Sequence, residues 1–322
     1  MPTRKREPDP DPASAEELAP TPAEAVAHPP QHFYGGQAVL EGVMMRGKDH
    51  WAIAVRRPDK SIFLQHFQIE SIAKRKPIFA KFGLRGIIAL GQALSIGVKA
   101  LTISANQAVE DDEKLSTGQM ALSMTLAMLI FVGVFIAGPA VAFGFLKDSV
   151  GTGVLSNVLE GVLRVLLFLG YLGLIGRMKD IRRVFQYHGA EHKTIAAFEH
   201  HDPLEPEAVD KYSTLHVRCG TNFLLIVMVL TIFVYSLIPT PSLGWRVGSR
   251  IIGIPIIAGL AYELLRLGAK YERSRFMHAL MTPGLWLQKI TTKPPSEDQI
   301  EVAIASFNEV LKAEAESAQP AA

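Results

Sequence analysis

An uncharged run of apolar residues constrains this chain more than any other feature. No Asp, Glu, Lys or Arg lies between residues 119 and 146, and crossing the hydrocarbon core of a bilayer takes about 20 apolar residues. The run therefore predicts a transmembrane helix, which Pro139 should kink or end. The chain has 322 residues, 48% of them hydrophobic, which suits a small membrane protein with a modest soluble part.

Three further apolar runs predict additional spans, at residues from about 155 to 176, 222 to 238 and 250 to 267. The first of these carries Glu160 and Arg164 at i to i+4 spacing, at which the two charges can pair. We therefore expect a mainly α-helical polytopic membrane protein of about four transmembrane helices within residues 118–268. A small β-rich cytoplasmic α+β cap should complete the fold.

The cap is predicted at residues 32–75. Two β-rich runs, 51–57 and 61–69, flank Pro58-Asp59-Lys60 and predict a hairpin. The glycine-bounded run 34–47 before them can add a strand. This run contains Glu41, a possible additional site residue, although a strand carboxylate that faces water is the simpler interpretation.

Residues 76–117 lead from the cap to the first span. Between residues 83 and 104 the sequence is apolar but interrupted by Arg85, Gln92 and Lys99. This pattern favours an amphipathic helix on the membrane surface or against the bundle, and leaves a membrane crossing open.

Both ends of the chain are predicted to lie outside the folded core. Residues 1–31 hold eight of the twenty prolines and almost no large apolar side chains, a composition typical of a disordered tail. Residues 269–315 should form a cytoplasmic segment and a helix that begins at a Ser296/Gln299 capping box. Residues 316–322 are expected to be disordered.

Lysine and arginine counts beside the spans predict the orientation. Seven of these residues lie between Arg177 and Arg218, whereas Lys147 is alone in the loop after the first span. The loop 177–220 and both termini should therefore be cytoplasmic, in a multi-pass protein of the cytoplasmic membrane. A net charge of +2 without long basic runs argues against nucleic-acid binding. The expected partners are membrane lipid and an unknown substrate or cytoplasmic protein, and the oligomeric state stays open.

The predicted cytoplasmic loop contains a candidate metal motif, Tyr187-His188-Gly189-Ala190-Glu191-His192-Lys193, in the order H-x-x-E-H. On a helix His188 and His192 lie one turn apart on one face, with Glu191 on its edge. Two imidazoles can bind Zn²⁺ or another divalent metal while Glu191 acts as the general base. The alternative is a solvated helix with two exposed histidines.

A catalytic zinc usually takes three protein ligands. His216 is our first choice for the third, Glu263 near the inner end of the fourth span follows closely, and Cys219 ranks third. Arg218 is a possible additional residue of the site, or an ion-pair partner of Glu263. Because Cys219 is the only cysteine, it excludes an internal disulfide and serves as one thiolate ligand, one nucleophile or one buried thiol.

Several stretches together resemble the YqhQ-like family, a group of uncharacterised bacterial membrane proteins described as predicted metal-dependent enzymes. The resemblance covers residues 33 to 312, and its motifs are 35–46, 187–193, 216–221 and 299–303. It implies that the histidine motif is a functional site. It adds nothing about a substrate, because the family's description rests on that same motif.

These observations lead us to expect a membrane-embedded, cytoplasm-facing, metal-dependent hydrolase, most plausibly a zinc enzyme, of unknown substrate. The alternative is a non-enzymatic membrane scaffold or binding protein that docks a cytoplasmic partner. A transporter fits less well, since four spans leave little room for a pathway.

Overall fold

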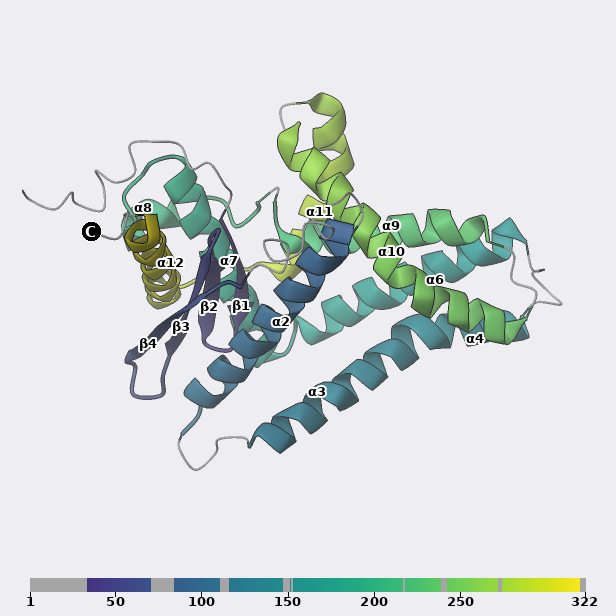
Figure 1. The fold of residues 1–322 in the computed structure, drawn as a ribbon, viewed down its shortest axis with the longest axis horizontal. Helices are drawn as coiled ribbons and strands as arrows, with labels where there is room; N and C mark the ends of the chain where they lie inside the picture. The colour runs from purple at the N-terminus through teal and green to yellow at the C-terminus, as the bar shows by residue number, and fades with distance from the viewer. Residues whose placement is uncertain are drawn as a thin grey trace, which may run out of the picture.

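The computed structural model describes residues 34–70, 84–110, 116–146, 151, 153–216, 218–238, 242–271 and 274–318. The predicted tail at 1–31, the last four residues and the basic residues between 74 and 81 lie outside these ranges. The described chain forms a cap of sheet and helices beside a bundle of long helices (Figure 1), which confirms the predicted fold class. Its elements are β1 (Gly35–Val39), β2 (Gly42–Arg46), β3 (His50–Arg56), β4 (Ile62–Gln68), α2 (Leu84–Gln107), α3 (Thr117–Phe131), η5 (Val132–Ala137, a π-helix), α4 (Gly138–Phe145), α6 (Val154–Ile175), α7 (Lys179–Glu199), α8 (Pro206–Asp210), α9 (Gly220–Ser236), α10 (Leu243–Lys270), α11 (Arg275–Thr291) and α12 (Glu297–Ala318).

The sheet is a four-stranded antiparallel meander in the order β1-β2-β3-β4. The predicted hairpin is confirmed as β3 and β4, in register from His50 opposite Gln68 to Arg56 opposite Ile62. The glycine-bounded run forms two strands rather than one, because Glu41 adopts a positive φ of 50° and turns the chain back. Such a backbone is uncommon outside glycine.

Helices cover both faces of the sheet. Residues of β2 and β3 pack with α7 and α12 in one core, where Tyr34, Phe198 and Phe307 make edge-to-face contacts with ring centroids 4.9–5.3 Å apart. The opposite face packs against α2 around Trp51 and Ile53. The start and the end of the described chain, together with the middle segment α7, therefore share a single folded cap.

Helix α12 begins where the sequence predicts. The backbone N–H of Ser296 donates to Gln299 Oε1 at 2.9 Å, which is one half of the predicted capping box. The helix runs three residues further than predicted, to Ala318, and thus includes the first residues of the segment expected to be disordered.

Four helices of the described residues are long and apolar enough to cross a membrane, at 85–107, 118–145, 154–175 and 243–268. Three of them match predicted spans. The predicted span at 222–238 is a shorter apolar helix, Gly220–Ser236. The fourth helix that is long and apolar enough to cross a membrane is α2. As predicted for an amphipathic helix against the bundle, α2 packs mainly on α10, where Arg85 pairs with Glu263. It also contacts the cap, where Arg46 donates to Gln92 Oε1 at 3.0 Å and the Lys99 ammonium lies 3.7 Å from the centroid of the Phe67 ring.

Pro139 does not end the first predicted span, which runs from Gly118 to Phe145. The chain forms the π-helix η5 just before it, then continues as α4. Proline lacks an N–H, so the carbonyl four residues earlier, that of Phe135, loses its helical donor. Arg164 of α6 supplies a substitute, since its Nε donates to Phe135 O at 2.7 Å.

The predicted pair of Glu160 and Arg164 forms, with Arg164 Nη2 lying 3.0 Å from Glu160 Oε1. Two arginines of α10 join it: Arg246 Nη1 lies 2.7 Å from Glu160 Oε2, and Arg250 Nε lies 3.2 Å from Oε1. The carboxylate is only 1% exposed. Because a buried charge needs partners, this cluster ties α6 to α10.

Candidate metal centre

The H-x-x-E-H motif lies in the buried middle of α7. Glu191 is 5% exposed, His192 is 1% exposed and His188 is half-buried, so the interpretation as a solvated helix with two exposed histidines is wrong. Gly189 lets the chain before α12 cross this helix closely, because a Cβ there would overlap the carbonyl oxygen of Lys293. A glycine at this point of the motif is therefore a packing requirement.

The structure brings His188, His192 and Cys219 together. One ring nitrogen of each histidine and the cysteine sulfur all lie within 4.8 Å of one another, and His188 Nε2 is 3.2 Å from Cys219 Sγ. Cys219 is the N-cap of α9. The cluster thus joins the cap, through α7, to the beginning of a bundle helix.

Backbone carbonyls fix the orientation of both imidazoles. His188 Nδ1 donates to Thr291 O at 2.9 Å, and His192 Nδ1 donates to Thr214 O at 2.6 Å. Since each Nδ1 must carry the proton, each Nε2 of a neutral ring presents its lone pair. Burial lowers the pKa of His192, which keeps this ring neutral. His192 Nε2 is buried and has no hydrogen-bond partner among the described residues.

Glu191 lies beside this cluster, against the edge strand β1. A Cβ at Gly36 would be 2.8 Å from Glu191 Cδ, so only glycine lets the strand come this close, and the Gly36 N–H bonds to the carboxyl group. Oxygen Oε2 of Glu191 is buried without a hydrogen-bond partner in the described part of the chain. Burial raises the pKa of Glu191.

His216, the first choice for a third ligand, lies next to the cluster but is not part of it. Its ring centroid is 5.7 Å from that of His192, and its Nε2 is 3.3 Å from Glu199 Oε2. Arg218 also pairs with Glu199. Burial alone would raise the pKa of Glu199, but the His216 hydrogen bond and the Arg218 charge lower it. The third-ranked candidate, Cys219, occupies the position expected for His216.

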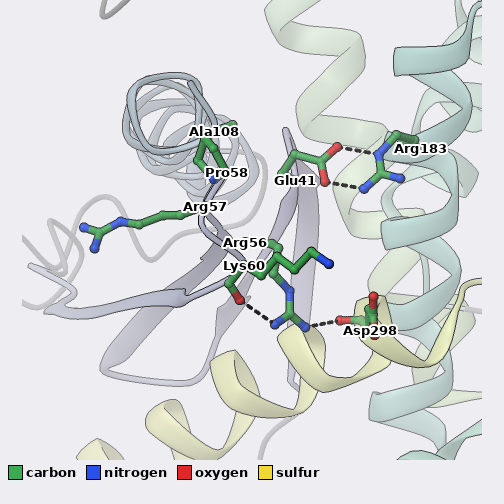
Figure 2. Close-up of a pocket in the computed structure, with 8 residues that line it drawn as sticks. All are labelled: Glu41, Arg56, Arg57, Pro58, Lys60, Ala108, Arg183 and Asp298. Carbon is green, nitrogen blue, oxygen red and sulfur yellow. Dashed lines mark hydrogen bonds and ion pairs between the residues drawn. The ribbon is translucent and has the colours of Figure 1, made fainter. Parts of the chain in front are cut away.

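Two predicted carboxylates lie elsewhere. Glu263 of α10 pairs with Arg85 of α2, and it is not part of the cluster of His188, His192 and Cys219. Glu41, in the turn between β1 and β2, pairs with Arg183 (Figure 2), and Tyr187 Oη donates to it at 3.3 Å. Both carboxylates bind cations of the chain itself.

Sequence reasoning missed the groups that support the cluster. Thr214 and Thr291 act through backbone carbonyls, which no side-chain pattern reveals. Gln288 holds the His216 backbone from both sides, since its Nε2 donates to His216 O and its Oε1 accepts from His216 N, each at 2.8 Å. Among the residues around the cluster, only Gly36 was marked in the sequence, because it belongs to the glycine-bounded run.

A cavity of about 330 Å³ adjoins the cluster. His188, Glu191 and Cys219 line one part of it, and Gly36 to Ala38 of β1 line another. The apolar side chains that complete it come from α6, α9 and α11: Phe168, Leu172, Leu224 and Leu287. The cavity therefore lies between the cap and the ends of apolar helices.

Comparison with known proteins supports the resemblance found in the sequence. Residues 83–313 match the family described as "Protein of unknown function (DUF1385)". The uncharacterized protein YqhQ of Bacillus subtilis (strain 168) is 39% identical over 305 residues, which cover 89% of this chain and 94% of that protein. No solved structure matches. Neither description names a metal or a reaction.

Proposed function

The chain belongs to the DUF1385 family, and from the geometry of its site we propose that it is a membrane-embedded, metal-dependent hydrolase. His188, His192 and Cys219 would hold a zinc ion, and Glu191 would serve as the general base. The substrate would be an amphiphile that enters from the membrane.

The observation that carries the proposal is the orientation of the two imidazoles. Each Nδ1 donates to a carbonyl, as metal-binding histidines do. The buried Nε2 of His192 has no other partner in the described residues, and leaving such a group unsatisfied costs about 1–3 kcal/mol. A zinc ion would satisfy it, and two nitrogens and one thiolate leave a fourth, open position.

Glu191 is placed to move a proton. A bound zinc ion supplies Lewis acidity, which polarises a carbonyl oxygen and makes water more acidic. Glu191 lies on the same helix face and lines the same cavity as His188, and its Oε2 has no partner among the described residues. It can accept a proton from water in the cavity and donate it to a leaving group.

The cavity walls favour an apolar substrate. Phe168 and Leu172 belong to a candidate span, α6, and Leu224 belongs to the apolar helix α9. A chain of carbon atoms could lie against these side chains while a polar ester or amide reaches the cluster. A soluble polar metabolite would gain little from such walls.

The shared core of the cap supports the proposed topology. The sheet, α7 and α12 pack together, so they lie on one side of a membrane and an even number of crossings separates them. Because α2 packs on the sheet, the crossing pairs would be α3–α4 with α6, and α9 with α10. At 17 residues, α9 would span roughly 26 Å, near the thickness of the hydrocarbon core. The lysines and arginines of the loops favour a cytoplasmic cap.

The test combines metal analysis with hydrolysis of p-nitrophenyl esters of increasing acyl length. Purified protein should contain one zinc per chain, His188→Ala should lose it, and Glu191→Gln should keep it while ester hydrolysis falls at least hundredfold. Rates should rise with chain length. Protein without stoichiometric metal would contradict the proposal, and a Glu191→Gln variant that still functions in cells would favour a scaffold.

The 3.2 Å contact between His188 Nε2 and Cys219 Sγ favours one second candidate, a thiol hydrolase. Cys219 would then be the nucleophile and His188 its base, oriented by Thr291 O. Chelation separates the two mechanisms. A thiol enzyme keeps its activity in EDTA and loses it to iodoacetamide, whereas the zinc enzyme loses activity in EDTA and regains it when zinc is added.

A further inference from the structure

A second pocket, of about 600 Å³, lies at the edge of the cap (Figure 2) and shares no lining residue with the cavity beside the histidine cluster. The turn between β1 and β2 contributes Glu41, and the hairpin of β3 and β4 contributes Arg56 and Lys60. Helix α7 contributes Arg183 and α12 contributes Asp298. Arg57 also belongs to the lining, but its guanidinium points away from the pocket (Figure 2) and donates to Gln107 Oε1 at 2.7 Å. The other charged residues are three cations and two carboxylates, so positive charge predominates.

Two of these cations are held in place before any ligand arrives. Arg183 makes a two-pronged ion pair with Glu41. Arg56 donates to the carbonyl oxygens of Lys60 and Asp298, at 3.0 and 2.8 Å, and to Glu301 Oε2 at 2.9 Å. Preorganised guanidinium groups lose little entropy when they bind an anion.

Lys60 is the cation that the fold leaves unused. Its side chain is exposed, and its Nζ has no hydrogen-bond or ion-pair partner among the described residues. Lys60 and Glu41 also have positive φ values, 68° and 50°, and among the described residues only His201 joins them outside glycine. Unfavourable backbone conformations tend to cluster at functional sites.

The pocket lies next to the ends of two candidate spans. Ala108, in its wall, is eight residues before Ser116, the N-cap of α3. Arg183 is eight residues after Ile175, where α6 ends. In the proposed topology both positions are on the cap side of the membrane. Anionic lipids of that leaflet attract basic residues by about 1 kcal/mol each.

We propose that this pocket binds the phosphate group of an anionic phospholipid, through Lys60 together with the exposed edges of Arg56 and Arg183. A bound headgroup would hold the cap against the membrane, with α7 and its histidines at a defined height. The site needs neither zinc nor hydrolysis, so it stands independently of the proposed activity. A soluble phosphate ester would present the same phosphate group to the pocket. The experiment below distinguishes it from a phospholipid.

The test is native mass spectrometry of the full chain, released from detergent with dioleoyl phosphatidylglycerol or dioleoyl phosphatidylcholine. Wild type should retain phosphatidylglycerol preferentially. Lys60→Asn should weaken this retention about fivefold, and asparagine suits the left-handed backbone of the position. Lys312→Gln removes an equally exposed lysine of α12 and should change nothing.

Equal retention of the two lipids, or equal effects of Lys60→Asn and Lys312→Gln, would overturn the proposal. Competition with inorganic phosphate tests whether the ligand is a soluble phosphate rather than a lipid. If millimolar phosphate displaces the lipid from wild type, and binds Lys60→Asn more weakly, the phosphate site stands but its lipid source is refuted.

Discussion

Zinc should stabilise this protein measurably, because the proposed ligands join two parts of the fold. His188 and His192 belong to α7 of the cap, whereas Cys219 caps α9. An ion bound to all three binds the folded state but not the unfolded chain. At a free zinc concentration one hundred times its Kd, the stabilisation is about 2.7 kcal/mol.

This free energy converts into a shift in Tm. Domains of 150–250 residues gain roughly 2–4 °C per kcal/mol, so zinc should raise the Tm of the cap by roughly 5–11 °C. The fluorescence of Trp51, which is 3% exposed and stacked on Phe67 in the cap, reports its unfolding. The experiment compares the melting of purified protein after EDTA treatment with melting after zinc is restored.

Variants identify the origin of the shift. His192→Ala should abolish it, because the variant lacks the buried Nε2 at the centre of the cluster. His200→Ala removes an exposed histidine at the end of the same helix and should leave the shift intact, as should Glu191→Gln, which is no ligand. A wild type that melts at one temperature with and without zinc, or a His192→Ala variant that shifts as far as wild type, would refute the reasoning.

Three further predictions concern the fold around the site. Gly189→Ala should destabilise the cap by about 1–3 kcal/mol, because the added Cβ would overlap Lys293 O. Gly173→Ala, where the space around the residue is open, is the control in thermal melts. Equal destabilisation by the two variants would contradict the packing argument. Glu160→Gln should cost about 3–5 kcal/mol, because it leaves the buried Arg246 and Arg250 and the half-buried Arg164 short of a partner. Glu301→Gln, at an exposed pair, should cost less than about 1 kcal/mol, and denaturation in detergent measures both. In a Cys219→Ser background, the single-cysteine variants Asp202→Cys and Ser317→Cys should react with a membrane-impermeant maleimide only after the cells are opened. Ser242→Cys should react in intact cells. Labelling of positions 242 and 202 from the same side of the membrane would contradict the two crossing pairs.

The sequence by itself determined the elements whose signal is local. An uncharged run from 119 to 146 can only be buried in lipid or protein, a Pro-Asp turn between β-rich runs makes a hairpin, and Ser296 with Gln299 starts a helix. The H-x-x-E-H spacing placed His188 and His192 on one helix face, because the period of a helix is independent of what it packs against. Composition likewise separated a membrane protein from a soluble one.

Tertiary structure decided what depends on contacts between distant segments. The sequence ranked His216 and Glu263 above Cys219 as the third ligand. In the structure the N-cap of α9 brings the Cys219 thiol to His188, whereas His216 lies with Glu199 and Glu263 with Arg85. Similarly, α2 is as apolar as a candidate span, but only the structure shows that it packs between α10 and the sheet. Backbone carbonyls of Thr214 and Thr291 orient the imidazoles, and because every residue has a carbonyl, only packing shows which ones reach the site.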